Sequence, residues 1–189
     1  MARSRVPRDT KTKITKLFKA GQTIPEIKAA VIDAFPKITP ESIRTVVRKH
    51  ISGLCDELWS KAVKIRDGNK CVISNKSSGL NSHHLIGRGN KKYRWTVENG
   101  VTLAADHHTL GNDVAAHGST DVTDRFSDWM KDNRPEQWAW FQSHRDDHEI
   151  VQVDIFQLLE ISNRLKTEIE EAKSRPMPDI MARKAVRNE

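Results

Sequence analysis

The sequence predicts a mainly α-helical protein that contains one small β-hairpin. Apolar residues recur at helical spacing over most of the 189 residues, and two short β-like segments, 82–86 and 99–104, lie near the middle of the chain. Turn residues such as Gly21, Pro36 and the run Asp67-Gly68-Asn69 separate the periodic stretches. A hydrophobic content of 37% is enough for one modest core and a small appended module.

The N-terminal part is predicted to be a basic arm followed by three short helices. Residues 1–10 are basic, are not followed by a long hydrophobic segment, and are expected to be flexible. Within 11–52, the first helix ends at Gly21, and the second begins after Thr23, which has Glu26 three residues later as in a capping box. A third helix completes the unit and ends near residue 50.

The third of these helices presents a basic face. Its outward residues include Arg44, Arg48 and Lys49. A trihelical unit with a basic third helix resembles a helix-turn-helix DNA-binding module, and the resemblance implies that these three side chains contact nucleic acid. Small three-helix units also serve in packing or in protein docking, and the sequence leaves both interpretations open.

Residues 53–148 are predicted to form the central domain. A linking helix is expected over 51–66, and a further helix, over 105–117, follows the second β-like segment. Residues 121–148 carry Trp and Phe at helical intervals, and Asn133-Arg134-Pro135 divides them into two helices. These aromatic side chains are expected to form a core that covers the hairpin.

The segment 149–175 is predicted to be one long helix, and 176–189 a charged tail. Along this helix, mainly apolar residues recur at near-heptad spacing and form a stripe. Such a stripe is typical of a coiled-coil homodimer seam or of a helix that packs on its own subunit, and the sequence leaves both open. The stripe consists of Val151, Ile155, Leu158, Ser162, Leu165 and Ile169.

Charge and cysteine content narrow the choice of function classes. A net charge of +7 and a pI near 9.5 favour a polyanionic partner, with nucleic acid first, although a merely basic protein stays an alternative. Cys55 and Cys71 show no paired spacing, which is typical of a reducing cytosol rather than of a secreted disulfide scaffold. No apolar run approaches the roughly 20 residues of a membrane span. We therefore expect a cytoplasmic protein without a membrane partner.

A pattern of histidine and asparagine marks the middle of the chain. His83 and His84 lie in the first β-like segment, Asn99 opens the second, and His108 follows it. A neutral imidazole can hold a divalent metal ion, and another one near its ordinary pKa can take a proton from water. His108 and Asn112 would share one face of the predicted helix, where both are acceptable ligands.

The spacing of His84, Asn99 and His108 resembles that of the HNH (ββα-metal) endonucleases. The segments 82–88 and 98–103 resemble the two strands of that family. The fold that the resemblance implies is a ββα-metal finger embedded among helices and preceded by the helix-turn-helix-like module.

The HNH resemblance also implies a role for each matching residue. It makes His84 the general base and Asn99 the residue that organises the loop between the strands. His83 and His108 become metal ligands, and Asn112 takes the last ligand position on the helix. The implied cofactor is one divalent metal ion, with Mg²⁺ or Mn²⁺ first and Zn²⁺ or Ni²⁺ as alternatives.

One feature of many HNH proteins is missing from this sequence. Those proteins brace the finger with a structural zinc held by two Cys-x-x-Cys knuckles, and the corresponding positions here are Cys71, Ser74, Ala104 and His107. We expect no structural zinc, and we expect the aromatic helices to brace the finger instead.

The loop between the two strands is basic. Arg88, Lys91, Lys92 and Arg94 are candidates for contacts to the phosphates of a nucleic acid. The alternative is a solvated loop without a ligand.

The sequence thus predicts a metal-dependent DNA endonuclease of phage or prophage origin, acting in a bacterial host cell. The order of elements after residue 120 has a weaker resemblance to NinG/Rap-type phage recombination endonucleases. That resemblance implies an alternative, a structure-specific resolvase for Holliday junctions or other branched DNA. A second alternative is a non-catalytic DNA-binding regulator with a degenerate finger.

Overall fold

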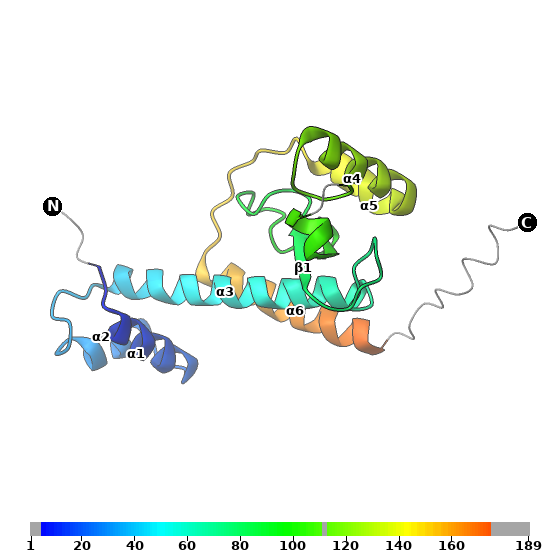
Figure 1. Ribbon diagram of the computed structural model, residues 1–189. Helices are drawn as coiled ribbons and strands as arrows, with labels where there is room; N and C mark the ends of the chain where they lie inside the picture. The colour runs from blue at the N-terminus through cyan, green and yellow to red at the C-terminus, as the bar shows by residue number, and fades with distance from the viewer. Residues whose placement is uncertain (1–4, 111–112, 175–189) are drawn as a thin grey trace, which may run out of the picture. The chain divides into compact units, whose positions relative to one another are not determined.

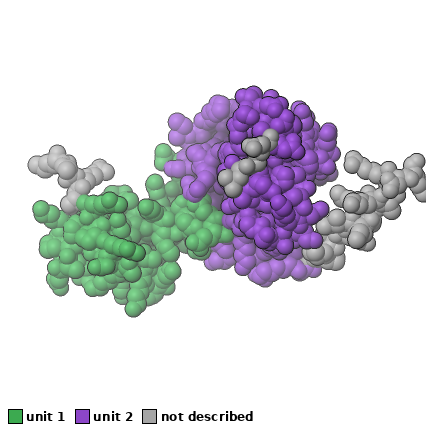
Figure 2. All heavy atoms as spheres, in the orientation of Figure 1, with its two compact units in different colours: residues 1–57, 152–163 green, residues 58–151, 164–189 purple. Residues whose placement is uncertain are grey.

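The computed structural model describes residues 5–110 and 113–174, and it confirms a mainly helical chain with one small antiparallel hairpin (Figure 1). Two compact units can be distinguished (Figure 2). Unit 1 combines residues 1–57 with 152–163, and unit 2 combines 58–151 with 164–189. Among the helices described, none is both long and apolar enough to span a bilayer.

Unit 1 is built on helices α1 (Arg8–Lys19), α2 (Ile24–Val31) and the first part of α3 (Pro40–Arg66). Helix α1 starts inside the segment 1–10, so the prediction of a flexible arm is wrong from Arg8 onward. The predicted cap of α2 is present, because the Glu26 carboxylate accepts a hydrogen bond from the Thr23 backbone N–H at 2.7 Å. The core of this unit contains Ile14, Ile27, Val31, Ile43, Val47, Ile51, Cys55 and Leu158.

Helix α3 is a single helix where the sequence analysis expected two. The chain carries no proline between Pro40 and Arg66, and Gly53 lies within the helix without ending it. The buried positions Val47, Ile51 and Cys55 follow each other at intervals of four, so one apolar stripe continues through the expected break.

Unit 2 contains the hairpin of β1 (Leu80–His84) and β2 (Gly100–Ala104), with the one-turn helix η1 (Val97–Asn99) before β2. The register is regular and antiparallel, and it pairs His83 with Val101. The first strand therefore begins and ends two residues earlier than predicted. All five residues of β2 are buried, which makes it the strand that anchors the hairpin.

The helix predicted over 105–117 is mostly absent from the described residues. Only the π-helical segment η2 (Asp106–Leu110) forms, and 113–119 is irregular. A continued α-helix would pair the carbonyls of His107 and His108 with N–H groups four residues later. Instead these carbonyls accept hydrogen bonds from Ala116 and His117, at 3.0 and 3.1 Å, so the chain folds back on η2.

Two helices cover the hairpin, as the sequence predicted. They are α4 (Thr120–Asn133) and α5 (Pro135–His144), and they meet at Arg134. Phe126 and Met130 of α4 share one core with Val101 and Leu103 of β2. That core also contains Cys71 and Ala104, and Trp129 and Trp138 pack against it partly buried.

The C-terminal helix α6 (Ile155–Ser174) begins six residues later than predicted and buries four of the six residues of the predicted stripe, whereas Val151 lies before the helix and Ile155 is half-buried. Leu158, Ser162, Leu165 and Ile169 are each at most 2% exposed within the single chain. These four positions therefore pack on their own subunit and are not available as a dimer seam. A homodimer through other residues of this helix stays a prediction.

A buried carboxylate ties three segments of unit 2 together. The Asp67 side chain is fully buried and forms ion pairs with Arg66 at 3.0 Å and Arg134 at 2.9 Å. It also accepts a hydrogen bond from the Thr102 backbone N–H, at 2.9 Å. Burial raises the pKa of Asp67, but the two guanidiniums and this N–H outweigh it and hold the pKa below its ordinary value.

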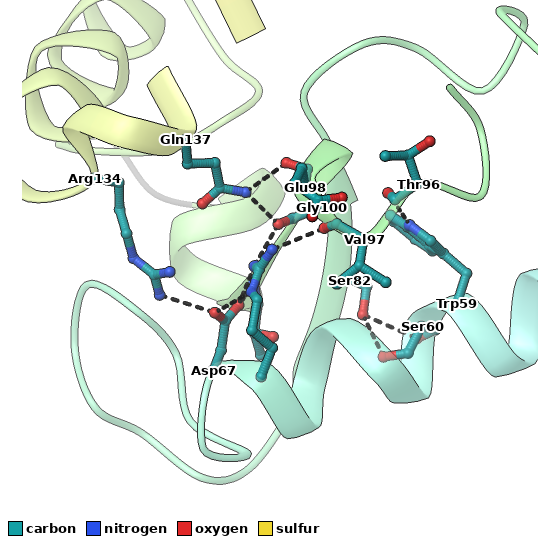
Figure 3. Close-up of polar contacts among 12 residues, drawn as sticks. Trp59, Ser60, Asp67, Ser82, Thr96, Val97, Glu98, Gly100, Arg134 and Gln137 are labelled. Carbon is teal, nitrogen blue, oxygen red and sulfur yellow. Dashed lines mark hydrogen bonds and ion pairs between the residues drawn. The ribbon is translucent and has the colours of Figure 1, made fainter. Parts of the chain in front are cut away.

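Gln137 of α5 extends this network, which is drawn in Figure 3. Its amide donates to the carbonyls of Glu98 and Gly100, both at 2.7 Å, and Arg66 donates to the same Gly100 carbonyl. The end of α3, the start of β2 and the start of α5 are thus fixed to one another by polar contacts. This network, together with the aromatic core, braces the hairpin.

We predict that Asp67→Ala lowers the free energy of unfolding by about 3 kcal/mol, because it leaves two partly buried guanidiniums without their counter-charge. Urea denaturation followed by circular dichroism measures the change. The matched control is Asp128→Ala, which removes an exposed aspartate paired with Lys131 and should cost less than about 1 kcal/mol. Equal losses in the two variants would contradict the bracing role of Asp67.

Candidate metal centre

Three histidines gather in unit 2, and they come from three different segments. The ring nitrogens that His83, His108 and His117 can offer to an ion all lie within 4.8 Å of one another. The ring centroids are 5.4 Å apart for His83 and His108, 4.8 Å for His83 and His117, and 5.1 Å for His108 and His117. Three imidazoles at this spacing form a candidate metal-binding site.

Local backbone structure explains how the three rings meet. His83 is fixed by its pairing with Val101 in the hairpin, and its ring is also roughly perpendicular to the Phe126 ring, with centroids 6.0 Å apart. His108 lies in η2, directly after β2. The backbone bond from His117 to the His108 carbonyl brings the third ring back to the other two.

The electrostatic environment keeps the ring of His83 neutral. Burial, followed by the charges of His117, His108 and His84, lowers the pKa of His83 to about 3. Burial and His117 also lower the pKa of His108. Neutral imidazole is the form that binds metal ions, so these rings are in the ligating state at neutral pH.

The donor set fits a divalent ion. A tetrahedral ion about 2.0–2.1 Å from each nitrogen holds its ligands roughly 3.3 Å apart, so the three ring nitrogens, which lie within 4.8 Å of one another, would draw closer around it. His117 is exposed, and His83 and His108 are half-buried, so one side of the cluster faces solvent. A substrate oxygen or a water could approach from that side.

His84 is the neighbour of His83 in the chain, but it makes different contacts. Its ring stacks on the Trp59 ring, with centroids 3.6 Å apart and planes at 12°. Its Nε2 lies 2.9 Å from the Arg94 carbonyl oxygen. Because a carbonyl only accepts, Nε2 carries the proton and Nδ1 is the basic nitrogen.

Trp59, on which the His84 ring stacks, is fixed by a hydrogen bond and by burial. Its indole N–H donates to the Thr96 carbonyl at 2.8 Å, and the residue is 3% exposed. A Cβ at Gly100 would lie 2.7 Å from Trp59 and 2.5 Å from Val63, so only glycine fits opposite His84 in the register. The sequence analysis did not identify Trp59 or Gly100 as part of the site.

Asn99 is fully buried and bonds to the loop between the strands. Its amide oxygen accepts from the Ile86 N–H at 2.6 Å, and its NH₂ donates to the carbonyls of Ile86 at 2.9 Å and Tyr93 at 3.0 Å. Three bonds from one side chain fix both ends of 86–93. The neighbouring Arg94 carbonyl, which contacts His84, is positioned by the same loop.

The sequence analysis did not identify His117 as a metal ligand. A continuous helix over 105–117 would have placed His117 about 13 Å from His108 and on the opposite face. Asn112, the fourth ligand that the sequence predicted, lies outside the described residues. His107 is not part of the cluster, since its Nδ1 donates to the Val114 carbonyl at 2.7 Å.

The basic loop is less available to a ligand than the sequence suggested. Lys92 pairs with Asp147 at 2.8 Å and with Glu149 at 2.6 Å. The Arg94 guanidinium stacks on Trp95, with 5.0 Å from Cζ to the ring centroid. Contacts to phosphate by Arg88, Lys91, Lys92 and Arg94 stay a prediction, and for Lys92 they would require displacement of two carboxylates.

Comparison of the chain with protein-family models, with curated proteins and with solved structures gave no match.

Proposed function

We propose that this protein is a metal-dependent DNA endonuclease of the HNH type, with a ββα-metal finger formed by β1, β2 and η2. One observation carries the proposal: a cluster of three imidazoles includes His83, and the next residue in the chain, His84, has its tautomer set by a backbone carbonyl. A purely structural or DNA-binding finger has no need for a basic nitrogen held in this way.

His83, His108 and His117 would hold the ion. Three neutral nitrogen ligands favour Zn²⁺, Ni²⁺ or Co²⁺ over Mg²⁺ and Mn²⁺, which prefer oxygen ligands. The preferred metal therefore shifts away from the Mg²⁺ or Mn²⁺ that the sequence placed first. The bound ion would supply Lewis-acid stabilisation of the phosphate and of the leaving 3′ oxygen.

His84 would act on the attacking water. Nδ1 takes the proton, while the Arg94 carbonyl holds the Nε2 proton and stabilises the imidazolium that forms. The stack on Trp59 fixes the plane of the ring, so the base needs no reorientation during the reaction. Asn99 acts as a positioning residue, because it fixes the loop that carries the Arg94 carbonyl.

DNA is the substrate that the remaining features support. The net charge of +7 favours a polyanion, and unit 1 joins three helices in the order of a helix-turn-helix-like module. The positive charge would hold the duplex near the metal centre independently of its sequence.

The proposal is tested by incubating supercoiled plasmid with the purified protein and Zn²⁺, Ni²⁺, Co²⁺, Mn²⁺ or Mg²⁺ in turn. We expect nicked or linear product with at least one of the first four ions, and none when EDTA is present. Absence of cleavage with all five ions would contradict the proposed activity. Parallel assays on a linear duplex and a four-way junction separate a general endonuclease from a branch-specific resolvase.

A further inference from the structure

The exposed face of helix α1 carries a concentrated positive charge. A hollow of about 470 Å³ in unit 1 is lined by six residues of this helix, and each of them is a cation or a threonine: Arg8, Lys11, Thr12, Thr15, Lys16 and Lys19. Their spacing of three and four residues places them on one side of the helix. The opposite side carries the buried residues Thr10 and Ile14.

The cations of this face form no ion pairs with other residues that the structure describes. Among residues 5–110 and 113–174, no ion-pair partner lies within 4.0 Å of Arg8, Lys11, Lys16 or Lys19. Lys13 shows the contrast, since it points away from this face and donates to the Ala30 carbonyl at 2.7 Å. Four cations close together repel one another, so an anionic partner would relieve this repulsion.

The face predicted from the sequence, on α3, has a different character. Arg44 and Arg48 line a second hollow of unit 1, but they share it with Glu41, Asp154 and Phe156. Arg44 lies 3.6 Å from the Glu41 carboxylate. Two acids and a 77% exposed phenylalanine make this hollow a poor match for phosphates.

We propose that the α1 face, rather than the α3 face, binds the phosphate backbone of duplex DNA. The proposal rests on the function proposed above, for which this face would hold the substrate. The six residues extend over about 16 Å of helix, long enough to follow several phosphates of one strand. The Thr15 hydroxyl adds a donor for phosphate oxygens, whereas the Thr12 hydroxyl donates to the Arg8 carbonyl at 3.2 Å. No large apolar side chain lines this hollow, which favours nucleic acid over a lipid surface.

The test is a binding measurement on the full-length protein. A fluorescein-labelled duplex of random sequence is titrated in EDTA, where no cleavage occurs, at several KCl concentrations. The triple variant Lys11→Ala, Lys16→Ala, Lys19→Ala is compared with Arg44→Ala, Arg48→Ala, Lys49→Ala, which removes the same charge from α3. Thermal denaturation checks that both variants fold, and a Lys→Arg triple on α1 retains the charge.

We expect the α1 variant to bind at least about 10-fold more weakly and its salt slope to fall by about 0.9 for each lost phosphate contact. The Lys→Arg variant should bind DNA like wild type, and the DNA affinity of the α3 variant should fall by less than about 3-fold. Equal losses in both alanine variants, or an unchanged salt slope on α1, would overturn the proposal.

A parallel titration uses vesicles of phosphatidylserine and phosphatidylcholine. Loss of vesicle binding by the α1 variant, with DNA binding intact, would assign the face to membranes and overturn the proposal. Because DNA binding is measured without metal, failure of plasmid cleavage and failure of this surface are separate results.

Discussion

Replacement of His84 by alanine is expected to lower the rate of DNA cleavage by about 10²–10⁴-fold, the usual contribution of a positioned general base. The affinity for Zn²⁺ should stay within about 2-fold of wild type, because His84 contacts Trp59 and the Arg94 carbonyl and is not one of the three clustered rings. Single-turnover cleavage at saturating metal, together with a zinc titration, measures both quantities.

Two controls distinguish a general-base role of His84 from a structural role. His148→Ala removes an exposed histidine outside the site and should cleave at the wild-type rate. Free imidazole added to the His84→Ala protein should restore part of the rate, because it can occupy the vacated stack on Trp59 and accept the proton. Cleavage by His84→Ala at the wild-type rate would contradict the assignment of the base.

Replacement of His117 by alanine is expected to weaken Zn²⁺ binding by at least about 100-fold. Removal of a ligand should lower the Zn²⁺ affinity by more than the 10–100-fold that is usual when a residue that only orients a ligand is removed. His117 is exposed, so the fold should be retained, and an unchanged unfolding midpoint checks this. Competition between the protein and a chelator for Zn²⁺ gives the affinity.

Asn112→Ala is the matching variant, since the sequence predicted that residue as a ligand. A large loss in His117→Ala with a small one in Asn112→Ala agrees with the three-imidazole cluster. A large loss in Asn112→Ala alone would return the site to the ligand set that the sequence predicted and would exclude His117.

The helical architecture and the two strands could be predicted because they depend on local patterns. The turn at Arg134-Pro135 and the apolar spacing of α4 and α5 are readable in the sequence, and the structure confirms them. The boundary between two expected helices at residue 50 was wrong because a buried stripe continues through α3. Periodicity gives the type of an element more securely than its ends.

The third member of the histidine cluster could not be predicted from local patterns. His117 reaches the site only because Ala116 and His117 bond back to the carbonyls of η2, and this return depends on tertiary structure. The same is true of Trp59, whose stack on His84 joins a helix and a strand about 25 residues apart, and of the Asp67 network. Short-range spacing identified His83, His84 and His108, but not the contacts that orient them.

The most direct test of the proposed metal centre is a crystal structure of the full-length protein with Zn²⁺, in which anomalous scattering locates the ion. We predict one ion with nitrogen ligands from His83, His108 and His117 at about 2.0–2.1 Å. We also predict that the His84 ring stays on Trp59 and does not bind the ion. An ion held elsewhere, or one that takes His84 in place of His117, would contradict the account of the site and of its base.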